Sequence, residues 1–190
     1  MTLYEQSFKR VFDALAAACA IVALSPLLLL TALAILLEDG GPVIFRQARM
    51  GRNGRTFVLM KFRSMPVGTP DLPSAASKTL TVTRVGAIIR RTNVDELPQL
   101  INILRGDMSV VGPRPALPSQ ETLLAARNRA GVSVLRPGLT GLAQVRSYDG
   151  MPEAEKVDWE RRYAARVTFL GDVGIILATV GYLFRRPPVY

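Results

Sequence analysis

The sequence contains no histidine and a single cysteine, Cys19. Without histidine there can be no Ser-His-Asp triad, no histidine general base and no histidine-ligated zinc. One cysteine allows neither a disulfide within the chain nor a cysteine-rich metal site. A nucleophile or base must therefore come mainly from carboxylates, hydroxyls, lysine or tyrosine, and any metal is expected to be a hard, oxygen-ligated cation such as Mg²⁺.

Acidic and aromatic residues are also scarce. The chain has 15 Asp and Glu and 24 Lys and Arg, which gives a formal net charge of +9. Residues 41–63 contain six basic side chains and no acidic one. This balance implies an anionic partner, which is nucleic acid, anionic lipid headgroups or a phosphorylated substrate. RNA binding usually adds base-stacking aromatics. The chain has only seven Phe, five Tyr and one Trp, and most of them lie within apolar patterns. We therefore expect that the anionic partner is not a nucleic acid.

Charge is absent altogether from the 24 residues Ala14–Leu37, and Ser25-Pro26 interrupts this run in its middle. A cleaved signal peptide fits poorly, because the apolar run continues for eighteen residues beyond Cys19. A plain transmembrane helix fits the length, since ~20 apolar residues cross a bilayer. However, basic residues flank both ends of the run, and they favour the cytoplasmic side for both.

A helix–break–helix that returns to the face it entered satisfies both flanks. Pro26 removes a backbone donor and clashes with the preceding turn, and Ser25 can hydrogen-bond a carbonyl freed at the kink. Each arm, 14–24 and 27–37, reaches about 16 Å, half of a bilayer core. We therefore predict a re-entrant membrane helix over residues 1–40 and a compact domain over residues 41–190, whose chemistry involves a lipid.

Beyond this segment the pattern predicts an α+β fold that is predominantly helical, with a small β-hairpin. Strands at 43–45 and 56–59 flank a turn at 51–54. The other expected elements are helices at 82–91, 95–104 and 119–129, a largely helical stretch at 153–184 that ends in a core or interfacial helix, a loop at 66–79, a turn at 136–141 and a short strand at 142–145.

Asp95-Glu96 is the most conspicuous acidic pair, because it follows Arg90 and Arg91 and begins a predicted helix. The simplest interpretation is that Asp95 is an N-cap and Glu96 a first-turn acid. The functional alternative is that a helix N-terminus and nearby arginines keep Asp95 ionised and attract phosphate. An ionised aspartate beside a phosphoryl group is then a candidate nucleophile.

Several ordered motifs together resemble the bacterial sugar transferases, in particular the small monotopic phosphoglycosyl transferases. They are Lys9-Arg10-Val11-Phe12-Asp13, Ser25-Pro26, Gly41-Pro42-Val43-Ile44-Phe45 with Gln47, Arg49 and Gly51, Lys61-Phe62-Arg63-Ser64-Met65, Asp95-Glu96-Leu97-Pro98-Gln99-Leu100 with Asn102, Gly106-Asp107-Met108-Ser109, Val111-Gly112-Pro113-Arg114-Pro115, and Arg136-Pro137-Gly138-Leu139-Thr140-Gly141 with Gln144. The resemblance runs almost from end to end of the chain.

This resemblance implies a catalytic domain on the cytoplasmic face of the bacterial inner membrane. It implies transfer of a sugar phosphate from a UDP-sugar to a polyprenol phosphate such as undecaprenyl phosphate, with release of UMP. The phospholipid membrane is then a partner, and a homodimer stays open. The alternative from another class is a non-catalytic basic module that binds anionic lipid or RNA.

By the same resemblance, Asp95 matches the family's nucleophile and Glu96 its paired carboxylate. Two diphosphate charges beside a carboxylate call for a cation, so we expect Mg²⁺, with Asp95 as a ligand. The basic motif positions Lys61, Arg63, Arg90 and Arg114 are candidates to bind phosphate or substrate; the alternative for each is a surface or fold-stabilising charge. Asp172 and Tyr163 match C-terminal family positions and are expected to position the last helix.

Overall fold

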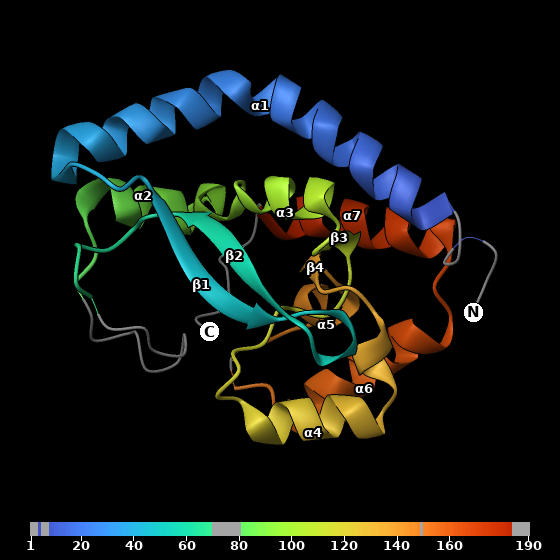
Figure 1. Cartoon of the computed structure of the whole chain (residues 1–190). Helices are drawn as coiled ribbons and strands as arrows, with labels where there is room; N and C mark the ends of the chain where they lie inside the picture. Colours follow the sequence, from blue (N-terminus) through green and yellow to red (C-terminus); the bar gives the residue numbers. More distant parts are fainter. Residues whose placement is uncertain (1–3, 5–7, 70–80, 149, 184–190) are drawn as a thin grey trace.

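The computed structural model describes residue 4 and residues 8–69, 81–148 and 150–183. Figure 1 shows a bent helix, α1, along one side of the molecule and α4 on the opposite side, with two small sheets between them. In chain order the elements are α1 (Lys9–Asp39), β1 (Ile44–Met50), η2 (Arg52–Gly54), β2 (Thr56–Phe62), α2 (Arg84–Arg91), η4 (Val94–Glu96), α3 (Gln99–Arg105), β3 (Ser109–Val111), α4 (Glu121–Arg129), η5 (Val132–Val134), β4 (Gly138–Thr140), α5 (Leu142–Val145), α6 (Glu153–Ala165) and α7 (Phe169–Leu183).

Helix α1 is a continuous helix of 31 residues with Pro26 in its interior. Figure 1 draws it as an arch that bends near its middle. Ser25 Oγ donates a hydrogen bond to the carbonyl of Val22 at 2.8 Å, as a hydroxyl beside a proline can. The predicted break is therefore a bend within one helix rather than an interruption between two.

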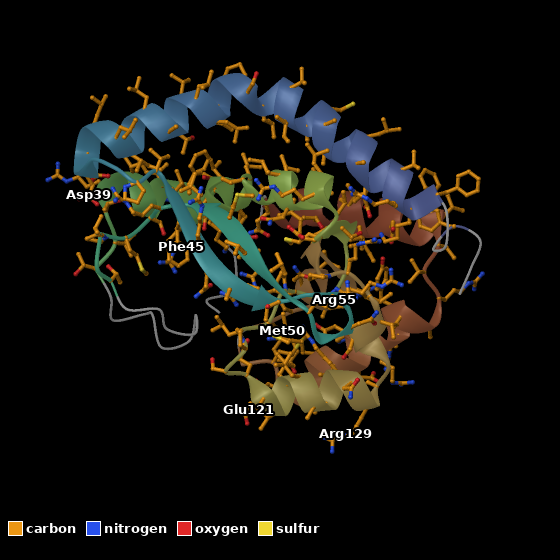
Figure 2. All side chains as sticks on the ribbon, viewed as in Figure 1. Asp39, Phe45, Met50, Arg55, Glu121 and Arg129 are labelled. Carbon is orange, nitrogen blue, oxygen red and sulfur yellow. The ribbon has the colours of Figure 1, made fainter. Side chains whose placement is uncertain are left out.

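One face of α1 packs on the body of the protein and the other is bare. Ala17 packs with Leu100 and Ile103 of α3, and Ile35 packs with Phe62. Only 11% of the most apolar 18-residue stretch of α1 is buried. Figure 2 shows side chains that point outward from α1, away from the rest of the molecule. The exposed apolar residues of α1 include Leu15, Val22, Leu29, Leu30, Leu33 and Leu37. A bare apolar face of this length suits a lipid environment.

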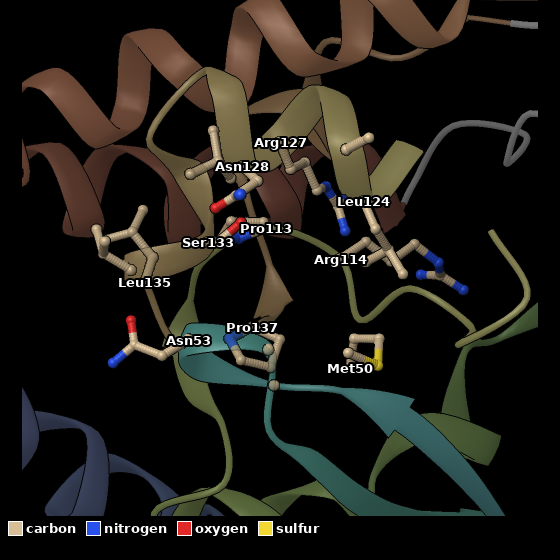
Figure 3. Close-up of a pocket in the computed structure, with 15 residues that line it drawn as sticks. Met50, Asn53, Pro113, Arg114, Leu124, Arg127, Asn128, Ser133, Leu135 and Pro137 are labelled. Atoms are coloured by element: carbon tan, nitrogen blue, oxygen red, sulfur yellow. The ribbon is translucent and has the colours of Figure 1, made fainter. Parts of the chain in front are cut away.

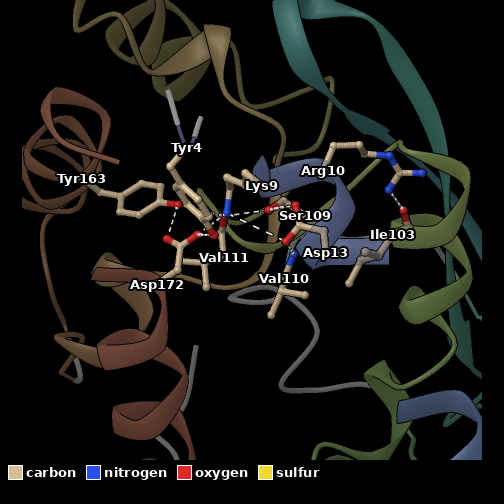
Figure 4. Close-up of polar contacts among 10 residues, drawn as sticks. All are labelled: Tyr4, Lys9, Arg10, Asp13, Ile103, Ser109, Val110, Val111, Tyr163 and Asp172. Carbon is tan, nitrogen blue, oxygen red and sulfur yellow. Dashed lines mark hydrogen bonds and ion pairs between the residues drawn. The ribbon is translucent and has the colours of Figure 1, made fainter. Parts of the chain in front are cut away.

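A buried polar cluster ties the start of α1 to β3, α6 and α7 (Figure 4). Asp13 is 1% exposed and accepts a hydrogen bond from Ser109 Oγ at 2.7 Å. Lys9 Nζ lies 2.5 Å from the carboxylate of Asp172, to which the Tyr163 hydroxyl donates at 2.8 Å. Because each buried charge has a partner, none carries the cost of an unpaired ion. The contacts of Asp172 and Tyr163 agree with their predicted positioning role.

The end of α1 is held to the same body. The Glu38 carboxylate accepts hydrogen bonds from the first two amides of α2, at 2.7 and 2.8 Å. Arg63 Nη2 donates to the carbonyls of Asp39 and Gly40 and lies 3.1 Å from the Asp39 carboxylate. Carbonyls at a helix C-terminus lack intrahelical partners, so an arginine there stabilises the helix end. Both ends of α1 thus attach to one body.

The described residues form two sheets of two strands each. Strands β1 and β2 pair antiparallel, which confirms the predicted hairpin and extends both strands. Strands β3 and β4 form a parallel pair that the sequence did not predict. Their backbones approach so closely that a Cβ on Gly138 would lie 2.1 Å from the amide nitrogen of Gly112. Only glycine at these motif positions permits the pairing.

The structure confirms some of the other predicted helices and strands and corrects others. Residues 142–145, predicted as a strand, form the helix α5, and a strand occupies residues 138–140, where we expected a turn. The predicted helix 95–104 divides into η4 and α3, and the C-terminal helical stretch divides into α6 and α7. Helices near 82–91 and 119–129 are confirmed as α2 and α4, whereas most of the loop at 66–79 lies outside the described residues. Short apolar runs cannot be assigned by periodicity alone, which explains the error at 142–145.

Candidate active site

Asp95 and Glu96 lie in η4, a 3₁₀ turn between α2 and α3. Asn93 precedes this turn with φ of 56°, a left-handed conformation that asparagine tolerates, and so redirects the chain after α2. Helix α3 itself begins at Gln99, with Pro98 at its N-cap. The N-cap positions are Asn93 and Pro98, so the interpretation of Asp95 as an N-cap is wrong. Glu96 does lie in the first turn of η4, together with Asp95.

Glu96 is the centre of a charged cluster that joins three segments. Lys61 Nζ, on β2, donates to Glu96 Oε1 at 2.7 Å, and Arg114 Nη2 contacts the same oxygen at 3.1 Å. Burial alone would raise the pKa of Glu96, but Lys61 and Arg114 outweigh it and hold this pKa at about 2. Glu96 is therefore ionised at physiological pH and fixes the direction of both cations.

Asp95 lies beside this cluster but behaves differently. Its carboxylate is 4.0 Å from Lys61 Nζ, and the residue is 9% exposed. Burial raises the pKa of Asp95, and the charge of Glu96 adds to this, whereas Lys61, Arg90 and Arg114 act in the opposite direction. The sequence predicted that nearby cations keep Asp95 ionised, but burial outweighs them and moves its pKa upward. A carboxylate of raised pKa is a stronger nucleophile once it is ionised.

The loop that carries Arg114 is set by the parallel strand pair. Gly112, directly after β3, donates its amide to the Thr140 carbonyl of β4 at 2.8 Å, and Gly138 donates to the Pro113 carbonyl at 2.8 Å. This close pairing fixes the backbone immediately before Arg114. The motif glycines and prolines around Arg114 thus orient a side chain that reaches Glu96.

Of the predicted phosphate-binding residues, Lys61 and Arg114 both contact Glu96. Arg90 lies near enough to Asp95 for its charge to oppose the rise in the pKa of Asp95. Arg63 is not part of this cluster. It is 7% exposed, and its guanidinium contacts the end of α1, at Asp39 and Gly40. Its phosphate contact stays a prediction, while the observed contacts give it a structural role.

Two residues to which the sequence assigned no role, Arg49 and Gln99, line a small pocket together with Lys61, Glu96 and Arg114. Arg49 Nη1 donates to the Pro115 carbonyl at 3.2 Å, directly after Arg114. Its Nε donates to Gln47 Oε1 at 2.8 Å. The sequence pattern of β1 could have indicated Gln47 and Arg49, because side chains alternate between the faces of a strand and residues 47 and 49 therefore share one face.

A larger cavity, of about 570 Å³, adjoins this cluster at Arg114 (Figure 3). It lies between the hairpin turn, α4 and η5, and its lining includes Met50, Asn53, Leu124, Asn128, Ser133 and Leu135. The candidate site therefore consists of a narrow charged part and a wider, mostly uncharged part. Arg114 belongs to both parts.

Among the residues that the structure describes, no three Asp, Glu, Cys or His gather as a metal site. Mg²⁺, however, is commonly held by one or two carboxylates together with substrate phosphates. Asp95 can supply such a carboxylate, whereas Glu96 Oε1 already receives two cations. A single carboxylate such as that of Asp95 is thus compatible with Mg²⁺ that is also held by a phosphorylated substrate, and the metal stays a prediction.

The structure thus combines a long apolar helix that is mostly exposed with a charged cluster of Lys61, Glu96 and Arg114. Residues 4–186 match the family described as bacterial sugar transferase, and the chain belongs to this family. A non-catalytic module that binds anionic lipid or RNA is therefore set aside.

Relatives with curated names agree with this family. A Caulobacter vibrioides protein named UDP-glucose:undecaprenyl-phosphate glucose-1-phosphate transferase is 44% identical over 96% of this chain and 72% of its own length. The exopolysaccharide production protein PSS of Rhizobium leguminosarum bv. phaseoli is 39% identical, over 89% of this chain and 88% of its own length. An undecaprenyl-phosphate glucose phosphotransferase of Komagataeibacter xylinus is 45% identical over 75% of this chain, which matches 28% of that protein.

Proposed function

We propose that this protein transfers a sugar 1-phosphate from a UDP-sugar to undecaprenyl phosphate, as the first membrane step of exopolysaccharide or related glycoconjugate assembly. The observation that carries the proposal is a buried Asp95 beside the Lys61–Glu96–Arg114 cluster. The names of the Caulobacter vibrioides and Komagataeibacter xylinus relatives support undecaprenyl phosphate as acceptor, and the former supports UDP-glucose as donor.

In the first step, an Asp95 carboxylate oxygen attacks the β-phosphorus of the donor, which bears the sugar. The bond between this phosphorus and the bridging oxygen breaks, and the electron pair leaves with UMP. Asp95 then carries the sugar phosphate as an acyl phosphate. Lys61, which lies 4.0 Å from the Asp95 carboxylate, and Arg114, which contacts Glu96, would neutralise charge on the phosphoryl oxygens, the main task of a protein in phosphoryl transfer.

In the second step, a phosphate oxygen of undecaprenyl phosphate attacks the same phosphorus. The acyl phosphate bond breaks and Asp95 is released as a carboxylate. The product is undecaprenyl diphosphate sugar. In an in-line displacement, the leaving UMP and later the attacking lipid phosphate would each occupy the position opposite the carboxylate oxygen, so one set of cations can serve both steps.

Bound Mg²⁺ would supply further neutralisation of the diphosphate charge. Asp95 is the carboxylate proposed to hold it. Both this metal and the homodimer stay predictions.

We also propose that α1 enters the bilayer and returns, with its ends and the body of the protein on the cytoplasmic face of the bacterial inner membrane. The support is the attachment of both helix ends to one body, at Asp172 and at Arg63. The bare apolar outer face and the bend near the middle of α1 fit the same topology.

The experiment uses the purified full chain with undecaprenyl phosphate, Mg²⁺ and a panel of UDP-sugars, scored by UMP release. Asp95→Asn should abolish release, because an amide is not a nucleophile toward phosphorus. Asp158→Asn is the matched control, since Asp158 pairs on the surface with Arg161 and Arg162. Intact-mass analysis with donor alone should show a sugar phosphate adduct on the wild type and none on Asp95→Asn.

Two results would contradict the proposal. The first is no UMP release by the wild type with any nucleotide sugar. The second is turnover without any adduct on Asp95, which would leave the transferase activity in place but remove the covalent step.

A further inference from the structure

We propose that the 570 Å³ cavity between the hairpin turn and α4 receives the nucleoside of the donor, with Asn128 contacting the base and Arg114 at the diphosphate end. This inference rests on the proposed function and assigns a place to one part of its substrate. It also assigns a specificity-determining role to residues that the sequence did not single out.

The position of Arg114 gives the orientation. Its guanidinium contacts Glu96 in the charged cluster, and the same side chain lines the cavity. A donor whose diphosphate lies between Lys61 and Arg114 can therefore extend into the cavity only from the Arg114 end. The part of the donor next to that end is either the nucleoside or the sugar.

The charges of the lining favour a neutral occupant. Apart from Arg114, the only charged residue among the lining residues described is Arg127. It is 6% exposed, and its Nε donates to Glu160 at 2.7 Å in a buried ion pair that joins α4 to α6. A second phosphate deep in the cavity would thus find no available cation, whereas an uncharged group would fit.

The walls favour a nucleoside over a hexose. Apolar side chains, among them Met50, Leu124 and Leu135, offer van der Waals contact to the faces of a base. Figure 3 shows Asn128 and Ser133 on one side of the cavity and Met50 on the other. Among the described contacts, no side-chain hydrogen bond engages Asn128 or Ser133, so both can serve a ligand. An asparagine amide matches the adjacent acceptor and donor of a uracil edge, while a hexose needs many polar partners.

The cavity is preformed by contacts between distant segments. Arg52 Nε of the hairpin turn donates to the Val134 carbonyl of η5 at 2.8 Å. The Met50 amide donates to the Ala116 carbonyl at 2.9 Å. Walls held in this way need little ordering on binding, which lowers the entropic cost.

The cavity also lies on the side of the molecule from which a water-soluble donor would arrive. Figure 1 places α4 opposite α1, and Figure 2 labels Met50 at the end of β1 that lies toward α4. With α1 facing lipid, the cavity faces the aqueous phase. The lipid acceptor would approach from the α1 side, and both substrates would meet at the charged cluster.

The test compares two tryptophan substitutions on α4. Ala125 lines the cavity and is exposed, so Ala125→Trp should fill the cavity without disturbing the core. Arg129 is exposed on the same helix outside the lining, so Arg129→Trp is the control. UMP affinity is measured by calorimetry on the full chain, and inhibition of turnover by inorganic phosphate is measured alongside.

Ala125→Trp should weaken UMP binding more than ~10-fold, because it removes the contacts of the nucleoside, and should leave phosphate inhibition unchanged. Arg129→Trp should change neither quantity. As a second variant, Asn128→Ala should weaken UMP binding by about 5-fold to 10-fold and reduce the preference for UMP over CMP. Thr122→Ala, an exposed α4 residue outside the lining, is its control.

Unchanged UMP affinity in Ala125→Trp and Asn128→Ala would overturn this inference. So would a raised KM for UDP-sugar in Ala125→Trp with UMP affinity unchanged, because the cavity would then hold the sugar. In both cases wild-type UMP release continues, and only the loss of that release would overturn the proposed function itself.

Discussion

Asp95 and Glu96 are neighbours in the chain, yet their surroundings drive their acidities in opposite directions. Two cations share Glu96 Oε1, while Asp95 is buried and Lys61 lies 4.0 Å from its carboxylate. Burial raises the pKa of Asp95, and the two cations hold that of Glu96 at about 2. Two carboxylates with separated pKa values are typical of sites in which each has its own role. Here Asp95 suits attack and Glu96 suits orientation of the cations.

The first prediction concerns pH. Attack requires ionised Asp95, so activity is present above its pKa and is lost as pH falls through it. Because that pKa is raised, the acid limb of kcat/KM should lie above the ordinary aspartate value of 3.8. Glu96 does not titrate in this window, since its pKa is about 2. Rates of UMP release across the acid range, with circular dichroism as a check of the fold, measure this; a limb at or below 3.8 would contradict it.

The second prediction separates two basic residues of one motif, Lys61 and Arg63. Lys61→Met should lower kcat by ~10²-fold, because it removes a cation from the phosphoryl site. Arg63→Met should instead reduce the free energy of unfolding by about 1–3 kcal/mol, because it leaves the end of α1 without its hydrogen bonds. Its UMP release per folded molecule should stay near that of the wild type. Thermal melting and UMP release on both variants decide this, and a loss of kcat in Arg63→Met without loss of stability would restore its predicted phosphate contact.

Helix α1 shows how one element can serve two environments. Its inner face contributes Ala17 and Ile35 to two cores, and its outer face exposes leucines to lipid. The bend lets the helix follow the body while both ends keep their polar contacts. By length and composition alone, α1 is long and apolar enough to cross a membrane.

The third prediction follows from this bend. Pro26→Ala restores a backbone donor and should straighten α1, so that a fraction of molecules carries its N-terminus across the membrane. A cysteine introduced near the N-terminus of a chain lacking Cys19 would then react with an impermeant maleimide from the outside of intact cells. Leu29→Ala, on the exposed face, should keep the wild-type topology. An N-terminus that stays inside in Pro26→Ala would show that the contacts of Lys9 and Asp13, not the bend, decide the topology.

At the scale of the whole molecule, residues before and after residue 40 pack against each other. Ala17 lies in a core with Leu59 and Ile103, and Asp13 binds β3. The membrane segment is thus also a structural layer of the domain that carries the site. The boundary between residues 1–40 and 41–190 stays a prediction about sequence, and these contacts indicate that the two parts fold together.

The fourth prediction tests this dependence. A chain of residues 41–190 alone should lose cooperative thermal unfolding, because burial of a side chain such as Ile35 is worth about 1.5–3 kcal/mol and total stability is of order 5–15 kcal/mol. Circular dichroism melts of the fragment and of the full chain in the same detergent measure it. The full chain with Leu29→Gln and Leu33→Gln, on the outer face, should unfold cooperatively. A fragment that melts like the full chain would contradict the argument.

Much of this architecture could be predicted from local patterns. Short-range periodicity and turn residues correctly predict the hairpin around residues 51–54 and the helices α2 and α4. The long apolar helix likewise follows from the uncharged run with its proline. The strand–helix error at residues 142–145 and the missed β3–β4 pairing have a common cause. Both depend on contacts between segments that are too short to show a pattern.

The residue types and motif order were enough to select Asp95-Glu96 and to exclude histidine and cysteine chemistry, because the absence of a side chain or the spacing of a motif does not depend on folding. Only the folded chain decided which cations meet the pair. Lys61 and Arg114 reach Glu96 from 35 and 18 residues away, while Arg63 turns to the end of α1, 24 residues before it. Burial of Asp95, and with it the direction of its pKa, likewise arises from packing between distant segments, and no local pattern records how deeply a carboxylate will be buried.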